Sequence, residues 1–193
     1  EMAYELGGGS SQAVSAIAFT QDEKLVPEDA VYLVGDDLRD IKNDISYARI
    51  TVIRLDGEYI KNHDDNALYA SMRATDYVRY HAFPKGYMMR ISAVREREPV
   101  RVSKEAVSHG INFAAVGLGL INAYRKRPEV EAVSIYFVTD QKIDYTFLKN
   151  EAHRCEQITD SLNNIFNGIT MDCSTCSSRE LCDEIDGLRQ LHM

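Results

Sequence analysis

Three of the chain's four cysteines lie within ten residues of one another, at Cys173, Cys176 and Cys182. A C-x2-C pair lets two thiolates face one metal ion or cluster across a tight turn, which is how zinc knuckles and iron–sulfur loops begin. The fourth cysteine, Cys155, lies on the preceding segment and would complete a tetrahedral set of ligands. The spacing therefore predicts one cysteine-ligated metal centre, either an iron–sulfur cluster of the 4Fe–4S type or a zinc ion.

Two other interpretations of these thiols stay open. The C-x2-C pair could be redox-active or form a disulfide, although thioredoxin-type chemistry places the pair at a helix start after a strand, without a third cysteine close behind. The thiols could also be independent side chains that share no ligand. Because they are clustered rather than spread as a disulfide framework, and because the N-terminal residues show no signal-peptide pattern, we expect the protein in a reducing cytoplasm.

A second candidate site lies in the basic segment, residues 73–104. It holds eight Lys and Arg residues against three Asp and Glu residues, whereas the whole chain carries a net charge of −8. Most of these cations are arginines, whose planar fork fits phosphate better than the point charge of lysine. The segment therefore predicts an anion site, with the alternative that its arginines point outward from strands and pair with acidic neighbours.

Composition limits the classes of function. The chain has 193 residues, of which 45% are hydrophobic and 27% charged, as in an ordinary globular protein. Its net negative charge argues against general nucleic-acid binding, and no apolar stretch approaches the 18 residues that would suggest a membrane span. We expect neither nucleic acid nor membrane as a partner.

The pattern of apolar residues predicts an α+β fold, with a mixed β-sheet packed against helices and a helical, cysteine-rich C-terminal tail. Glycine and turn residues bound the expected strands, which are residues 3–6, 13–19, 31–34 (read as buried), 48–55 (closed by a turn at 56–57), 87–94, 100–102 and 130–139. The expected helices are residues 64–80, 104–127 (starting at the N-cap Ser103) and 141–166. We expect a core domain at residues 1–150 and a metal-binding tail at residues 151–193.

Several segments, in order along the chain, resemble the central domain of the CO-methylating acetyl-CoA synthase family of the carbon monoxide dehydrogenase/acetyl-CoA synthase system. The match is best at residues 100–106 (VRVSKEA). The other matching segments are residues 5–9 (ELGGG), 34–38 (VGDDL) and 135–142 (IYFVTDQK). The cysteine tail falls where the family's cluster-bearing domain begins with its own C-x2-C.

This resemblance implies that the chain binds coenzyme A or an acyl-CoA and works with other subunits of an anaerobic one-carbon or acyl-transfer complex. It assigns a phosphate-binding role most directly to Arg101, then to Arg95, with Arg97 and Lys104 beside them. One departure is Pro99, which stands where the family has a tryptophan two residues before the arginine.

A second departure concerns the nickel site of the family, which needs a C-x-C segment that this sequence lacks. We therefore do not expect this polypeptide to complete acetyl-CoA synthesis alone, although it would be part of an acyltransferase. The alternative from a different class is a non-catalytic scaffold or electron-transfer subunit with a metal-stapled tail.

Overall fold

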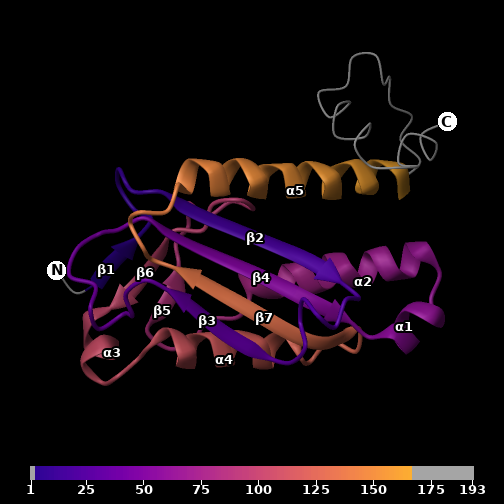
Figure 1. Cartoon of the computed structure of the whole chain (residues 1–193), viewed down its shortest axis with the longest axis horizontal. Helices are drawn as coiled ribbons and strands as arrows, with labels where there is room; N and C mark the ends of the chain where they lie inside the picture. Colours follow the sequence, from indigo (N-terminus) through magenta and orange to yellow (C-terminus); the bar gives the residue numbers. More distant parts are fainter. Residues whose placement is uncertain (1–2, 167–193) are drawn as a thin grey trace, which may run out of the picture.

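The computed structural model describes residues 3–166 and is built around a four-stranded mixed sheet (Figure 1). In spatial order its strands are β2 (Ala13–Thr20), β4 (Tyr47–Leu55), β7 (Val130–Val138) and β3 (Ala30–Val34). The pairs β2–β4 and β3–β7 are parallel, and the central pair β4–β7 is antiparallel. This arrangement confirms the predicted α+β class with a mixed sheet.

A second, smaller sheet lies at one end of the first (Figure 1). It is antiparallel, in the order β1 (Ala3–Leu6), β6 (Val100–Ser103) and β5 (Tyr87–Met89). The basic segment therefore supplies two of its three strands.

Helices cover the larger sheet unevenly. They are α1 (Gly57–Lys61), α2 (Asp65–Tyr77) with the 3-10 turn η1 (Val78–Tyr80), α3 (Lys104–Ser108), α4 (Phe113–Tyr124) and α5 (Tyr145–Phe166). Figure 1 shows α2 and α4 behind the sheet and α5 running along β2. The part of the sheet near β3 is left open on the side that faces the viewer.

The main core lies between this sheet and α4. Phe137 of β7 stacks on Phe113 of α4 with ring centroids 4.5 Å apart, and both are fully buried. A Cβ atom on Gly117 would come within 2.5 Å of Val31 in β3, so a glycine is needed for α4 to pack this closely on the strand. Gly117 thus permits the close packing of α4 on β3.

A second apolar cluster attaches α5. Tyr145 and Ala152 pack on Val14, Ala48 and Val138, which share one face of β2, β4 and β7. The domain boundary expected at residue 150 falls inside this continuous helix.

Four predictions differ from the structure. Strand β3 was predicted to be buried, which is wrong: it lies at the sheet edge, and Tyr32, Leu33 and Val34 are each about 40% exposed. The single helix expected over 104–127 is broken, because Gly110 adopts a φ of 91° and Asn112 caps a new helix. The strand expected over 87–94 ends at Met89, and residues 56–57 start α1 instead of closing a turn.

The N-cap predicted at Ser103 is confirmed, since its side chain accepts a hydrogen bond from the Ala106 amide. Within residues 3–166, no helix is long and apolar enough to cross a membrane. The predicted tail is described only as far as Phe166, within α5, and Cys173, Cys176 and Cys182 lie outside the described residues.

Candidate functional site

The small sheet brings a carboxylate and an arginine side by side. Strand pairing sets Glu5 of β1 and Met88 of β5 on either side of Arg101 in β6, so the three side chains share one face. Arg101 donates from Nε and Nη2 to Oε1 of Glu5, at 3.1 and 3.0 Å. Glu5 is therefore its partner, and not Glu98, the neighbouring carboxylate in sequence.

A second arginine converges on the same carboxylate. Arg90 follows β5, and its main-chain N–H donates a hydrogen bond to the carbonyl oxygen of Pro99 at 2.8 Å. Its side chain donates from Nη1 to Oε2 of Glu5. The hydrogen bond from Arg90 holds the pKa of Glu5 below its ordinary value. Burial raises this pKa by less than Arg90 lowers it, and the hydrogen bond from Arg101 lowers it further. Two guanidinium groups on one carboxylate leave one net positive charge.

This arginine pair borders a groove of about 520 Å³. The residues that line it are Met88, Met89, Arg90, Ile91, Ser92 and Arg101. Ile91 and Met88 expose their apolar side chains beside the cations. The groove thus offers charge-assisted donors and apolar surface together, which suits an amphiphilic anion.

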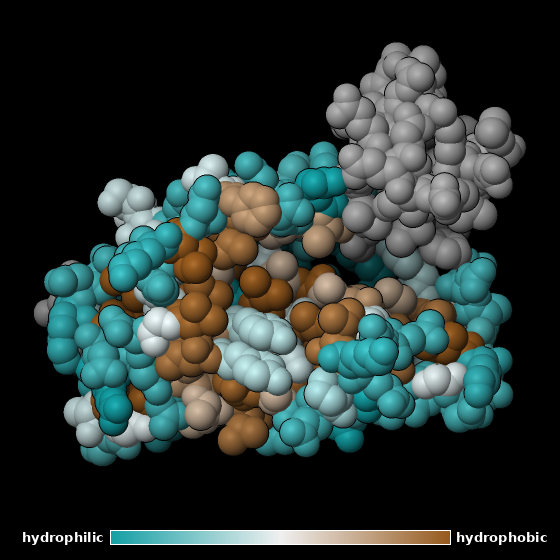
Figure 2. Space-filling view, in the orientation of Figure 1, coloured by the Kyte–Doolittle hydropathy of each residue, from teal (hydrophilic) through white to brown (hydrophobic). Residues whose placement is uncertain are grey.

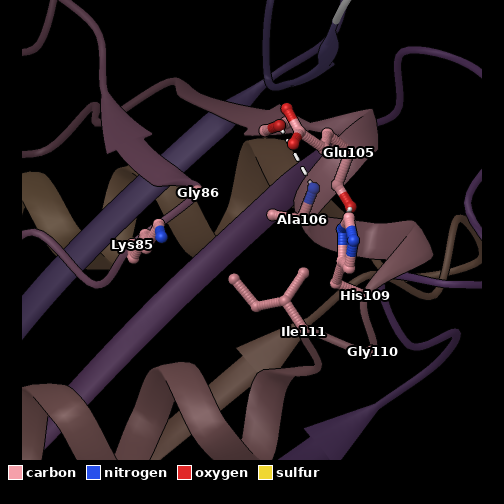
Figure 3. A pocket seen from close by; sticks show the side chains of 8 residues that line it. Lys85, Gly86, Glu105, Ala106, His109, Gly110 and Ile111 are labelled. Atoms are coloured by element: carbon pink, nitrogen blue, oxygen red, sulfur yellow. Dashed lines mark hydrogen bonds between the residues drawn. The ribbon is translucent and has the colours of Figure 1, made fainter.

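A larger cavity of about 750 Å³ opens beside the same sheet (Figure 3). Its wall includes Lys85 on one side and His109 on the other, with the apolar Ala106 and Ile111 between them. The ring Nδ1 of His109 lies 2.8 Å from the carbonyl oxygen of Glu105, which leaves Nε2 available as an acceptor. This cavity shares no lining residue with the arginine groove.

The other predicted phosphate ligands do not line either cavity. Arg95 pairs with Glu156 of α5 at 3.0 Å. Arg97 is half-buried in a tight turn, where its main-chain N–H and C=O groups form hydrogen bonds with those of Val94. Lys104 places its Nζ 4.7 Å from the ring centre of Tyr4, a cation–π contact.

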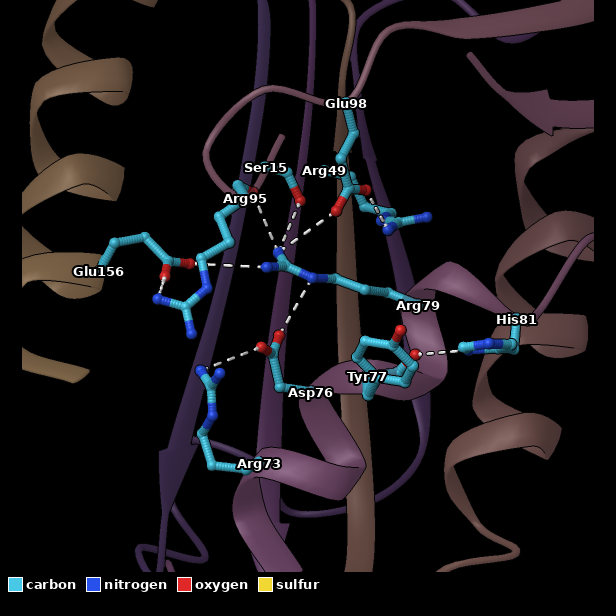
Figure 4. A network of polar contacts seen from close by, with 10 residues as sticks. All are labelled: Ser15, Arg49, Arg73, Asp76, Tyr77, Arg79, His81, Arg95, Glu98 and Glu156. Carbon is cyan, nitrogen blue, oxygen red and sulfur yellow. Dashed lines mark hydrogen bonds and ion pairs between the residues drawn. The ribbon is translucent and has the colours of Figure 1, made fainter. Parts of the chain in front are cut away.

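A buried polar network, which sequence reasoning did not identify, centres on Arg79 (Figure 4). Its guanidinium lies 3.0 Å from Asp76, 3.2 Å from Glu98 and 3.6 Å from Glu156, and it also donates to the carbonyl of Arg95. The network therefore joins α2, η1, the loop before β6 and α5.

Arg49 of β4 completes the network by donating to the second oxygen of Glu98. Burial alone would lower the pKa of Arg49, but the Glu98 carboxylate raises it above its ordinary value, so the guanidinium stays charged. Nearby, burial raises the pKa of Tyr87 to about 12, and its hydroxyl contacts that of Tyr47. Arg49, Glu98, Tyr47 and Tyr87 are buried, and none of them lines the arginine groove or the larger cavity.

Of the four predicted metal ligands, only Cys155 lies in the described part of the chain. It is exposed on α5, where partial burial of the thiol raises its pKa. Residues 3–166 contain no group of three or more His, Cys, Asp or Glu side chains arranged to hold a metal. A metal centre would therefore depend on Cys173, Cys176 and Cys182.

Comparison with protein families places this geometry in context. Residues 1–143 match the model of the family described as the CO dehydrogenase/acetyl-CoA synthase complex beta subunit. The chain belongs to this family. No match was found among curated proteins.

The beta-subunit match covers both sheets and ends just before α5. Glu5, Arg90 and Arg101 thus lie inside the matched region, whereas Cys155 and Glu156 lie beyond it. The membership confirms the family resemblance and supports a role as an acetyl-CoA-synthase-like subunit among the other subunits of a complex.

Proposed function

We propose that this subunit binds coenzyme A or an acyl-CoA in the groove of Arg90 and Arg101, and contributes to acyl transfer within the larger complex. The observation that carries the proposal is the convergence of both arginines on Glu5 beside an exposed apolar surface. A ligand phosphate would take the place of the Glu5 carboxylate. The pantetheine arm would contact Met88 and Ile91.

The proposal revises which arginine assists Arg101. The sequence suggested Arg95, but its pairing with Glu156 directs it toward α5, whereas Arg90 lines the groove and shares the carboxylate. Hydrogen bonds to charged groups contribute about 1.5–3 kcal/mol each. Two such contacts would account for a difference between micromolar and undetectable binding.

We also propose that Cys173, Cys176 and Cys182 hold an iron–sulfur cluster or a zinc ion, with Cys155 or an outside group as the fourth ligand. Cys155 precedes the end of α5 at Phe166 by eleven residues, about 16 Å along the helix. The seven steps from Phe166 to Cys173 span up to about 23 Å. The reach of the chain therefore allows Cys155 to be a ligand.

The alternative is a non-catalytic scaffold or electron-transfer subunit. The Arg79 network favours it in one respect, because Arg79 and Arg95 both engage Glu156 and so fix α5, the helix that precedes the cysteines. In that case Glu5 would simply satisfy two structural arginines.

Calorimetric titration with coenzyme A at low salt separates the two functions. Arg101→Ala should weaken binding at least tenfold, and Arg101→Lys should recover only part, because an ammonium cannot fork onto a phosphate. Arg97→Ala is the matched control, since Arg97 does not line the groove. No heat from the wild-type protein at millimolar coenzyme A would leave the scaffold function as the better account.

A further inference from the structure

The free edge of β3 exposes main-chain groups in a regular pattern. The carbonyl oxygen of Val34 accepts from the amide of Thr139 at 2.8 Å, so the main chain of Val34 faces β7. Because these groups alternate sides along a strand, those of Val31 and Leu33 point away from the sheet. Among residues 3–166, no strand pairs with this side.

This edge lacks the features that normally prevent strand addition. Its sequence, Ala-Val-Tyr-Leu-Val, contains no charge, no proline and no bulge. Tyr32, which stacks on Tyr136 of β7 with ring centroids 4.7 Å apart, is 41% exposed. Figure 2 shows apolar side chains gathered over this face of the sheet.

Acidic residues flank the strand at both ends. Glu28 and Asp36 are exposed, two residues before and two residues after β3. The nearby Asp29 accepts from the amide of Val133 and pairs with Arg125, so its charge is already engaged. The free edge is thus an apolar, hydrogen-bonding centre with one exposed acidic residue beyond each end of the strand.

We infer that β3 accepts an added β-strand from a partner protein, with an apolar, alternating centre and a lysine or arginine at each end. The outward N–H and C=O groups of Val31 and Leu33 would form the ladder, as in other strand-addition interfaces. Because both ends of β3 are acidic, the basic ends fit in either strand direction. The site is separate from the arginine groove on the small sheet.

The charges disfavour a second copy of this chain as the occupant. Antiparallel self-pairing centred on Tyr32 would bring the Glu28 end of each strand toward the Asp36 end of the other copy. Like charges directly opposite each other destabilise a strand pair. The pattern therefore selects a basic partner.

The test uses a nine-residue peptide that has two lysines at each end and five alternating valine and threonine residues in the centre. A control peptide has glutamates in place of the lysines. Amide hydrogen exchange of the full chain is followed by NMR. The lysine peptide should slow exchange of Val31 and Leu33 at least tenfold, while Tyr32 and Val34, which already bond β7, stay unchanged. The glutamate peptide should have no effect.

Leu33→Pro provides the matched variant. It removes one outward N–H without touching the ladder to β7, so it should fold and bind the lysine peptide at least tenfold more weakly. Leu33→Ala, which keeps the N–H, should bind more tightly than Leu33→Pro. Equal binding of both peptides, no effect of Leu33→Pro, or a concentration-dependent dimer that Leu33→Pro abolishes would each overturn the inference.

Discussion

The guanidinium of Arg79 lies 3.2 Å from the carboxylate of Glu98, and their side chains are only 1% and 2% exposed. Arg49 holds the other oxygen of the same carboxylate. One glutamate therefore pairs with two buried cations from different elements, and Asp76 and Glu156 supply further negative charge at Arg79. Its position at the start of the segment that leads into β6 couples the small sheet to the large one.

Removing this charge should be costly. We predict that Glu98→Gln lowers the free energy of unfolding by about 3–5 kcal/mol, because it leaves Arg49 and Arg79 buried with too little negative charge. Denaturant titration measures the change. Glu23→Gln, at an exposed position, should stay within about 0.5 kcal/mol of wild type. Similar stabilities for both variants would mean that water or other groups solvate the network.

The contact between α4 and β3 should tolerate no added methyl group. Gly117→Ala should destabilise the protein by about 1–3 kcal/mol, despite a gain of about 1 kcal/mol in helix propensity, because the new Cβ meets Val31. Adding Val31→Ala should restore part of the loss in a double-mutant cycle. Gly57→Ala, where a Cβ meets no atom within 4 Å, is the control and should cause no loss.

Glu5 should make stability depend on pH. Its pKa is lowered in the folded protein, chiefly by Arg90, relative to an unfolded value of about 4.3. Its contribution is therefore complete above that value and is lost as the pH falls through the folded pKa. The stability difference between wild type and Glu5→Gln should be largest above about pH 5 and should shrink at lower pH. A difference that is constant with pH would contradict this linkage.

The cysteine centre predicts metal in the purified protein. Anaerobic wild-type protein should contain iron, with a brown colour, or colourless zinc, and Cys176→Ser should lose most of it. Cys155→Ser then identifies the fourth ligand: loss of metal implicates Cys155, and retention implicates an outside group. Wild-type protein reconstituted anaerobically that holds neither metal would refute the centre.

Local patterns in the sequence were enough to predict most strands and the fold class. Apolar runs ended by glycine or turn residues located β2, β4 and β7, because such runs form strands wherever they are buried. The helix break at Gly110 also had a signal, since a glycine followed by Asn112 combines a helix end with an N-cap. The edge position of β3 had none, because an apolar run does not reveal which strands flank it.

The candidate site was only partly predictable. The arginine excess predicted an anion site in the basic segment, and the family resemblance pointed to Arg101 within it. Its partner Glu5 is 96 residues away in sequence and is joined to it only by the pairing of β1 with β6. The Arg79 network could not be predicted for the same reason, because tertiary contacts bring its residues together from separate elements. Charged residues in strands and loops read as outward-facing until the tertiary contacts that bury them are known.

The most direct test of the proposed function is a calorimetric comparison of coenzyme A binding by wild type and Glu5→Gln. If Glu5 occupies the phosphate position, removing its charge frees both arginines, and Glu5→Gln should bind about tenfold more tightly, ~1.4 kcal/mol. Glu23→Gln, which changes the net charge equally, should bind as wild type does. Unchanged or weaker binding by a folded Glu5→Gln protein would contradict the claim that the arginine pair is a coenzyme A site.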